Sequence, residues 1–173
     1  CETGLMRDLA TLPKAHLHLH FTGSMRPSTL VDLAQQHGMR LPAALLSGTP
    51  LQVAATERGW FRFQRLYDAA RACVRTEADM RRIVREAAED DAAEGSGRLE
   101  IQVDPTSYAP HVGGITPALE IVLDEARSAI RKLGGTYERT VTYTVPGTDV
   151  THSVVVIRKT AATQPKYPRR WAK

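Results

Sequence analysis

Residues 11–38 read TLPKAHLHLHFTGSMRPSTLVDLAQQHG, and this stretch decides the fold class. Apolar side chains alternate with three histidines from Leu12 to Phe21, and a period of two predicts a β-strand. After a turn that contains glycine, Pro27 opens an amphipathic helix that Gly38 ends. A strand followed directly by a helix predicts an α/β fold.

The chain up to residue 133 continues with signals of the same kind. Residues 39–59 carry mixed signals and predict a loop with a short helical turn. Thr76 and Asp79 predict a capping box, and the alternation in RLEIQVDP predicts a second strand that ends at Asp104. Helical spacing predicts three more helices, over residues 60–74, 76–94 and 116–133.

After Gly135 the pattern changes to β-branched and aromatic residues. Residues 137–145 and 153–159 predict two strands, and PGTD at 146–149 predicts the turn between them. The pattern therefore predicts an antiparallel β-hairpin, followed by an irregular basic tail that contains two prolines.

The composition excludes several classes of protein. With 42% hydrophobic and 24% charged residues, the chain has the composition of an ordinary soluble domain. No apolar run approaches the roughly 20 residues of a membrane span, and we expect no secretory leader. Cys1 and Cys73 form no CxxC pair, which favours a reducing cytoplasm.

The charge is distributed unevenly along the chain. Residues 1–129 contain 14 Lys+Arg and 17 Asp+Glu, a net charge of −3, whereas residues 130–173 contain 9 and 2, a net charge of +7; the two add to the +4 of the whole chain. Two explanations stay open: two segments of separate origin, or one domain with a basic terminus.

His18 and His20 stand two residues apart, so both imidazoles are predicted on one face of the first strand. Neutral imidazole is a common zinc ligand, and two from one strand supply half of a tetrahedral site. A solvated histidine-rich edge, or histidines bonded to backbone groups, explains the same spacing. The spacing alone therefore does not establish a metal site.

Residues 12–42, LPKAHLHLHFTGSMRPSTLVDLAQQHGMRLP, resemble the opening of the adenosine deaminase family of metal-dependent hydrolases. The resemblance continues through FRFQRLYDAARACVRTEADMRRIVREAAEDDAAEGSGRLEIQVDPTSYAP to about residue 125. It implies an incomplete TIM barrel that contains the first two β/α units, because a complete barrel takes about 250 residues and this chain has 173.

The resemblance also implies functional residues and a purine nucleoside as the substrate. His18 and His20 would bind Zn at the carboxyl end of the first strand. Phe63 and Tyr67 would lie near the purine, although helical spacing explains both equally well as core residues. Thr22 stands where many relatives have an acidic residue that holds a ribose hydroxyl, which leaves the nucleoside preference open.

The catalytic set that the family implies is incomplete. Family members take a third histidine ligand, a His/Glu pair and an Asp-Asp motif from later strands, and we find none of these here. Of the other histidines, His16 stands where relatives commonly have Glu, and His37, His111 and His152 have no Glu three residues later. We therefore expect that this chain alone does not deaminate adenosine.

The basic tail has two interpretations. Lys166, Arg169 and Arg170 lie beside Tyr167 and Trp171, so weak RNA binding is physically reasonable, and so is a solvated end without a ligand.

The PGTD, HSVVVIRK and KYPRR pieces of residues 130–173 resemble the C-terminus of the bacterial small-subunit rRNA guanine methyltransferase family, also called glucose-inhibited division protein B. The resemblance implies a final hairpin and an RNA-facing tail. No glycine-rich loop for S-adenosylmethionine is found, because GSGR at 95–98 precedes a strand rather than following one. We divide the chain into an adenosine deaminase-like part, 1–128, and a methyltransferase-like part, 129–173.

Three interpretations agree with the sequence. The chain is a truncated or chimeric adenosine deaminase-like protein that is inactive alone, a nucleic-acid-binding fragment of a methyltransferase, or a self-standing α/β domain. An opened barrel would expose strand edges and the inward side chains of both strands, so we expect self-association. These side chains are Leu17, Leu19, Leu99 and Ile101.

Overall fold

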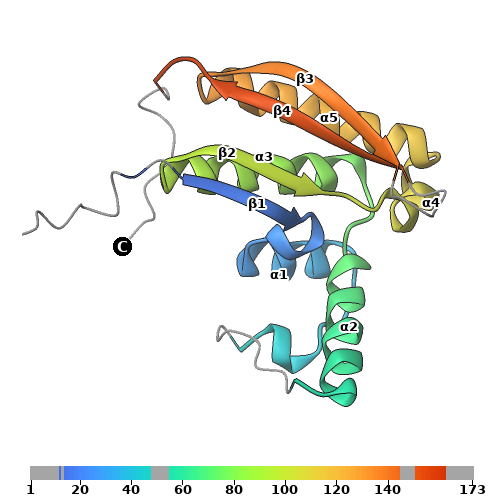
Figure 1. The fold of residues 1–173 in the computed structure, drawn as a ribbon. Coiled ribbons are helices and arrows are strands. Elements are labelled where there is room, and N and C mark those ends of the chain that lie inside the picture. The colour runs from blue at the N-terminus through green and yellow to red at the C-terminus, as the bar shows by residue number, and fades with distance from the viewer. Residues whose placement is uncertain (1–11, 13, 48–54, 145–150, 163–173) are drawn as a thin grey trace, which may run out of the picture. The chain divides into compact units, whose positions relative to one another are not determined.

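The computed structural model describes residues 12, 14–47, 55–144 and 151–162 (Figure 1). They form two compact units. The first unit contains the described parts of residues 20–87 and 102–125, and the second contains those of residues 1–19, 88–101 and 126–173. Within the described ranges, no helix is long and apolar enough to cross a bilayer.

The longer helices and the strands follow one another in the order that the sequence pattern predicts. The α-helices are α1 (Pro27–Gln36), α2 (Glu57–Arg71), α3 (Glu77–Ala93), α4 (Ala109–Val112) and α5 (Ile115–Lys132). The 3-10 helices are η2 (Thr22–Ser24), η3 (Ala43–Leu45) and η4 (Pro105–Ser107). The strands are β1 (Lys14–His20), β2 (Ser96–Gln102), β3 (Gly135–Thr144) and β4 (Thr151–Lys159).

Side-chain caps fix the starts of α2 and α3. The Thr76 hydroxyl accepts a hydrogen bond from the Asp79 backbone N–H at 3.2 Å, and the Asp79 carboxylate accepts one from the Thr76 N–H at 2.9 Å, which confirms the predicted capping box. The predicted start of α2 at Trp60 is wrong by three residues. Thr56 caps that helix by accepting from the Gly59 N–H at 3.2 Å, upstream of the first apolar residue.

The core of the first unit is made by apolar side chains from its helices and from the residue after β1. Burying one side chain of this size stabilises the fold by about 1.5–3 kcal/mol. The largest fully buried apolar side chains are those of Phe21, Leu33, Val74, Met80, Ile83 and Val84.

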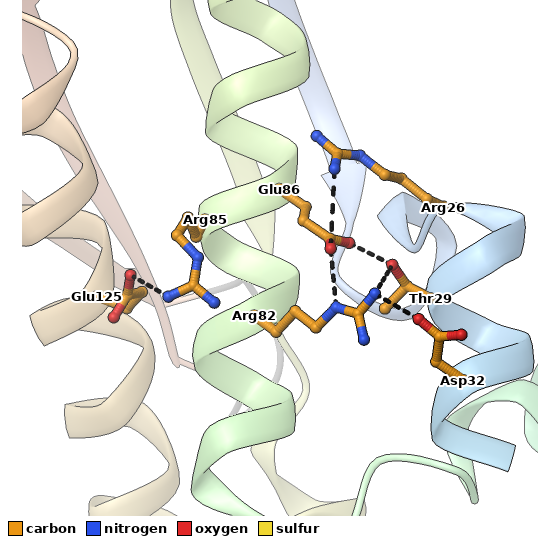
Figure 2. A network of polar contacts seen from close by, with 7 residues as sticks. All are labelled: Arg26, Thr29, Asp32, Arg82, Arg85, Glu86 and Glu125. Carbon is orange, nitrogen blue, oxygen red and sulfur yellow. Dashed lines mark hydrogen bonds and ion pairs between the residues drawn. The ribbon is translucent and has the colours of Figure 1, made fainter. Parts of the chain in front are cut away.

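A network of charged side chains also joins helices of the first unit (Figure 2). Glu86 of α3 accepts hydrogen bonds from Thr29 of α1 at 2.5 Å and from Arg82 at 2.8 Å. Arg82 also donates to Asp32 at 2.8 Å, so one guanidinium holds α1 against α3. Its hydrogen bond to Glu86 raises the pKa of the Arg82 guanidinium above its ordinary value. On the other side of α3, Arg85 donates to Glu125 of α5 at 3.4 Å.

The second unit holds two separate two-stranded sheets. β1 pairs with β2, and their arrows point the same way in Figure 1, as in parallel strands. β3 and β4 pair antiparallel from Gly135 opposite Lys159 to Thr144 opposite Thr151, with a bulge between Tyr137 and Arg139. The turn predicted at 146–149 and most of the tail lie outside the described residues.

Gly134 sits where α5 leads into β3, and its conformation requires glycine. Its φ is +78°, and a Cβ at this position would lie 2.5 Å from the carbonyl oxygen of Ala161. The Gly134 carbonyl accepts from the N–H groups of Thr160 and Ala161, at 3.0 and 2.8 Å. The chain therefore packs backbone against backbone at the base of the β3–β4 pair.

Candidate functional site

The carboxyl end of β1 is held to the carboxyl end of β2. The Phe21 N–H donates to the Gln102 carbonyl at 2.9 Å, and the buried Phe21 ring makes an edge-to-face contact with Tyr108 at 5.3 Å between ring centres. In α/β folds, binding and catalytic residues gather at this end of parallel strands. We therefore expect a functional site among the residues around Phe21.

Thr22, predicted to contact a ribose, is 4% exposed. Its hydroxyl shares a hydrogen bond of 2.5 Å with the hydroxyl of Tyr108. Burial raises the pKa of the Tyr108 phenol to about 12, so this hydroxyl keeps its proton at any physiological pH. A ligand that bonds to Thr22 therefore has to share the hydroxyl with Tyr108.

A row of aromatic rings runs along α2, and it includes both residues predicted to contact a purine. The ring centres of Trp60 and Phe63 are 5.8 Å apart, and those of Phe63 and Tyr67 are 6.0 Å apart. Leu66, on a neighbouring face of the helix, is buried, whereas Phe63 and Tyr67 are half-buried. Phe63 and Tyr67 therefore keep apolar surface that a ligand can reach.

Tyr67 brings this row to the end of β1. Its ring meets the His20 imidazole edge to face, with 6.4 Å between ring centres and an angle of 85° between planes. The structure thus brings together His20, Tyr67 and Phe63 within the first unit.

Arg71, the last residue of α2, connects the aromatic row to the loop after β2. Its guanidinium carbon lies 5.3 Å from the centre of the Tyr67 ring. One of its nitrogens donates to the Ser107 hydroxyl at 3.0 Å and lies 4.0 Å from the Asp104 carboxylate. The sequence pattern gives no signal for Arg71, because each of these contacts except the one to Tyr67 crosses more than 30 residues of chain.

His18 has a backbone conformation that is rare for a residue with a side chain. Its φ is +61°, in the left-handed region. Histidine enters this region more often than most residues, but the conformation still costs about 1–3 kcal/mol and is found preferentially at functional sites. This strain also interrupts the regular pleat on which the prediction of one shared histidine face depends.

Two other histidines, His16 and His37, have carboxylate partners. His16 donates from Nδ1 to Oδ1 of Asp91 at 2.9 Å in the second unit, and the other oxygen of that buried carboxylate has no partner among the described residues. His37 donates from Nε2 to Asp79 at 2.8 Å. Burial alone would raise the pKa of Asp79, but hydrogen bonds from the Arg75 and Thr76 N–H groups and from His37 lower it.

The histidines at the end of β1 are candidate metal ligands. His18 and His20 are exposed imidazoles, which is the donor type that zinc prefers. In the part of the chain that the structure describes, no group of three or more His, Cys, Asp or Glu side chains could hold a metal ion. The two histidines fit zinc by chemistry but do not by themselves complete a site.

Comparison with known proteins decides the family. The family model described as adenosine deaminase matches residues 13–166. The chain belongs to the adenosine deaminase family. Over 129 residues it is 67% identical to a Streptomyces virginiae protein named "Putative adenosine/adenine deaminase", a match that covers 74% of this chain and 38% of the relative.

A solved structure supports the same relationship. An amidohydrolase from Burkholderia ambifaria, solved with bound Zn, superposes with a TM-score of 0.57 and 27% identity. The superposition covers 77% of this chain and 38% of the other. The chain therefore spans little more than a third of the length of these family members.

A second, shorter match concerns another family. The chain is 50% identical over 48 residues to the ribosomal RNA small subunit methyltransferase G of Limosilactobacillus reuteri. This match covers 28% of this chain and 20% of the relative.

Lys166, Arg169 and Arg170, predicted to contact nucleic acid, lie outside the described residues.

Proposed function

We propose that the chain is the first part of a zinc-dependent hydrolase that removes the amino group of adenosine or a related purine. In this proposal residues 1–128 contribute the first two β/α units of a (β/α)8 barrel. The observation that carries it is the family match over residues 13–166, together with the strained His18 at the carboxyl half of β1. The site is then the cluster around the ends of β1 and β2.

Each residue of the cluster has a role in this proposal. His18 and His20 hold zinc, and a zinc ion held there supplies Lewis-acid activation of water. Phe63 and Tyr67 offer flat apolar surface to the purine ring. The Thr22 hydroxyl, already bonded to Tyr108, positions the sugar.

Among the residues that the structure describes, the proposed site has no group of side chains that could complete a metal site. A catalytic zinc site has three protein ligands, and proton transfer to the purine requires a positioned acid or base. We therefore propose that this chain binds metal and purine weakly and does not turn over, and that residues 129–173 are a methyltransferase-like segment of separate origin.

The experiment measures zinc affinity and ammonia release with the full 173-residue chain. Calorimetric titration with zinc should show binding that His18→Ala and His20→Ala each weaken, while the exposed His111→Ala serves as the matched control. Ammonia release from adenosine and from adenine should stay at the level of a zinc-only blank. Zinc affinity unchanged in both variants would contradict the ligand assignment, and zinc-dependent turnover would contradict the inactivity.

A further inference from the structure

Arg71 joins the aromatic row of α2 to the loop after β2. Its side chain is 21% exposed, so its guanidinium is largely withdrawn from solvent. We propose that Arg71 is a positioning residue that holds Tyr67 and the loop after β2 in the arrangement that receives the purine. The inference rests on the proposed function, because it assigns a role in that same site.

The contact between Arg71 and Tyr67 holds the Tyr67 ring in place. A guanidinium 5.3 Å from a ring centre is attracted to the ring electrons. The planar guanidinium covers part of the ring and limits how the ring can tilt. The Tyr67 ring also contacts the His20 imidazole edge to face. A change in the tilt of Tyr67 therefore changes the packing around His20.

The contacts of Arg71 with the loop after β2 hold that loop in place. Arg71 donates to Ser107 of η4, and Asp104, 4.0 Å away, caps the same short helix by accepting from the Thr106 N–H at 3.0 Å. Tyr108 follows directly and carries the hydrogen bond to Thr22. The Arg71 guanidinium therefore sets the distance between the aromatic row of α2 and the loop after β2, whose Tyr108 bonds to Thr22.

The geometry requires arginine rather than a general cation. Arg71 also pairs with Asp68 one turn earlier on α2, so its planar group serves two acceptors while it lies over a ring. Lysine carries a compact ammonium on a flexible stem and cannot make these contacts together. The conservative substitution Arg71→Lys is therefore informative, because it keeps the charge and removes the fork.

The test uses the full chain with isotope-labelled aromatic and histidine side chains. In the unaltered protein, nuclear Overhauser contacts between the His20 and Tyr67 rings are expected, and Arg71→Ala and Arg71→Lys should weaken or abolish them. Arg81→Lys is the matched control, since Arg81 pairs with Glu77 and Glu125 away from this cluster. Circular dichroism should show that all three variants stay folded.

Adenosine titration followed by the same signals provides the second measurement. The dissociation constant should rise about tenfold in Arg71→Ala and about threefold in Arg71→Lys, where tenfold corresponds to roughly 1.4 kcal/mol. Ring contacts and affinity that stay unchanged in both variants would overturn the inference. If adenosine does not bind the unaltered chain, the proposed function fails, and the His20–Tyr67 contact still decides the role of Arg71.

Discussion

The hydrogen bonds of Asp79 allow one stability prediction to be worked out in detail. The side chain is 2% exposed, and its carboxylate accepts from the N–H groups of Arg75 and Thr76 at 2.9 Å each and from His37 at 2.8 Å. All three donors meet the same oxygen, Oδ2, so Asp79→Asn can keep a carbonyl oxygen there but removes the negative charge that strengthens each hydrogen bond. Hydrogen bonds to charged groups contribute about 1.5–3 kcal/mol each, so we expect a loss of roughly 3 kcal/mol.

Urea unfolding followed by circular dichroism measures this loss. With a denaturant slope of about 2 kcal/mol per molar, the midpoint should fall by about 1.5 M. The matched control is Asp32→Asn, which removes a half-exposed partner of Arg82 and should change stability by less than about 1 kcal/mol.

The same carboxylate predicts a pH dependence. Because its pKa is lowered in the folded state from the ordinary 3.8, the Asp79 contribution is present above that pH and is lost as the pH falls through the folded-state value. Asp79→Asn should therefore flatten the acid side of the stability profile. A midpoint within 0.2 M of the unaltered chain, or an unchanged acid side, would refute the reasoning.

Three further predictions follow from single contacts. Glu86→Gln should cost roughly 1.5–3 kcal/mol in urea unfolding, because the buried carboxylate accepts from two donors; no loss would contradict the network. Gly134→Ala should speed amide exchange in β3 and β4, because its Cβ would meet a carbonyl oxygen at 2.5 Å. Gly38→Ala is the control: its φ is +65° but its Cβ would lie in open space, so backbone strain should lower the free energy of unfolding by only about 1–2 kcal/mol. Tyr108→Phe should remove the phenol that titrates near pH 12 in absorbance at 295 nm; its persistence would contradict the burial of Tyr108.

Local signals were sufficient to find most elements. The alternation around the three histidines predicted β1, and the capping box predicted the start of α3. The sequence pattern missed η4 and α4, which together span Pro105–Val112, because elements of three and four residues show no periodicity. The Thr56 cap also starts α2 three residues before its first apolar residue, which is why the predicted start was late.

The candidate site was predicted only in part. Phe63 and Tyr67 were identified through a resemblance, and the pattern could not separate a pocket from a core because helical spacing is the same in both. The structure leaves Phe63 and Tyr67 half-buried and reveals contacts of Tyr108 and Arg71 with residues far apart in the chain. The left-handed conformation of His18 has no sequence signal, since histidine is compatible with a regular strand.

X-ray absorption at the zinc edge of the zinc-loaded chain tests the central claim most directly. The account predicts two imidazole nitrogens at about 2.0–2.1 Å from the metal, with water or buffer in the other positions. In the His18→Ala, His20→Ala double variant this imidazole signal should disappear. An imidazole signal of the same size in the double variant would contradict the assignment of His18 and His20 as metal ligands.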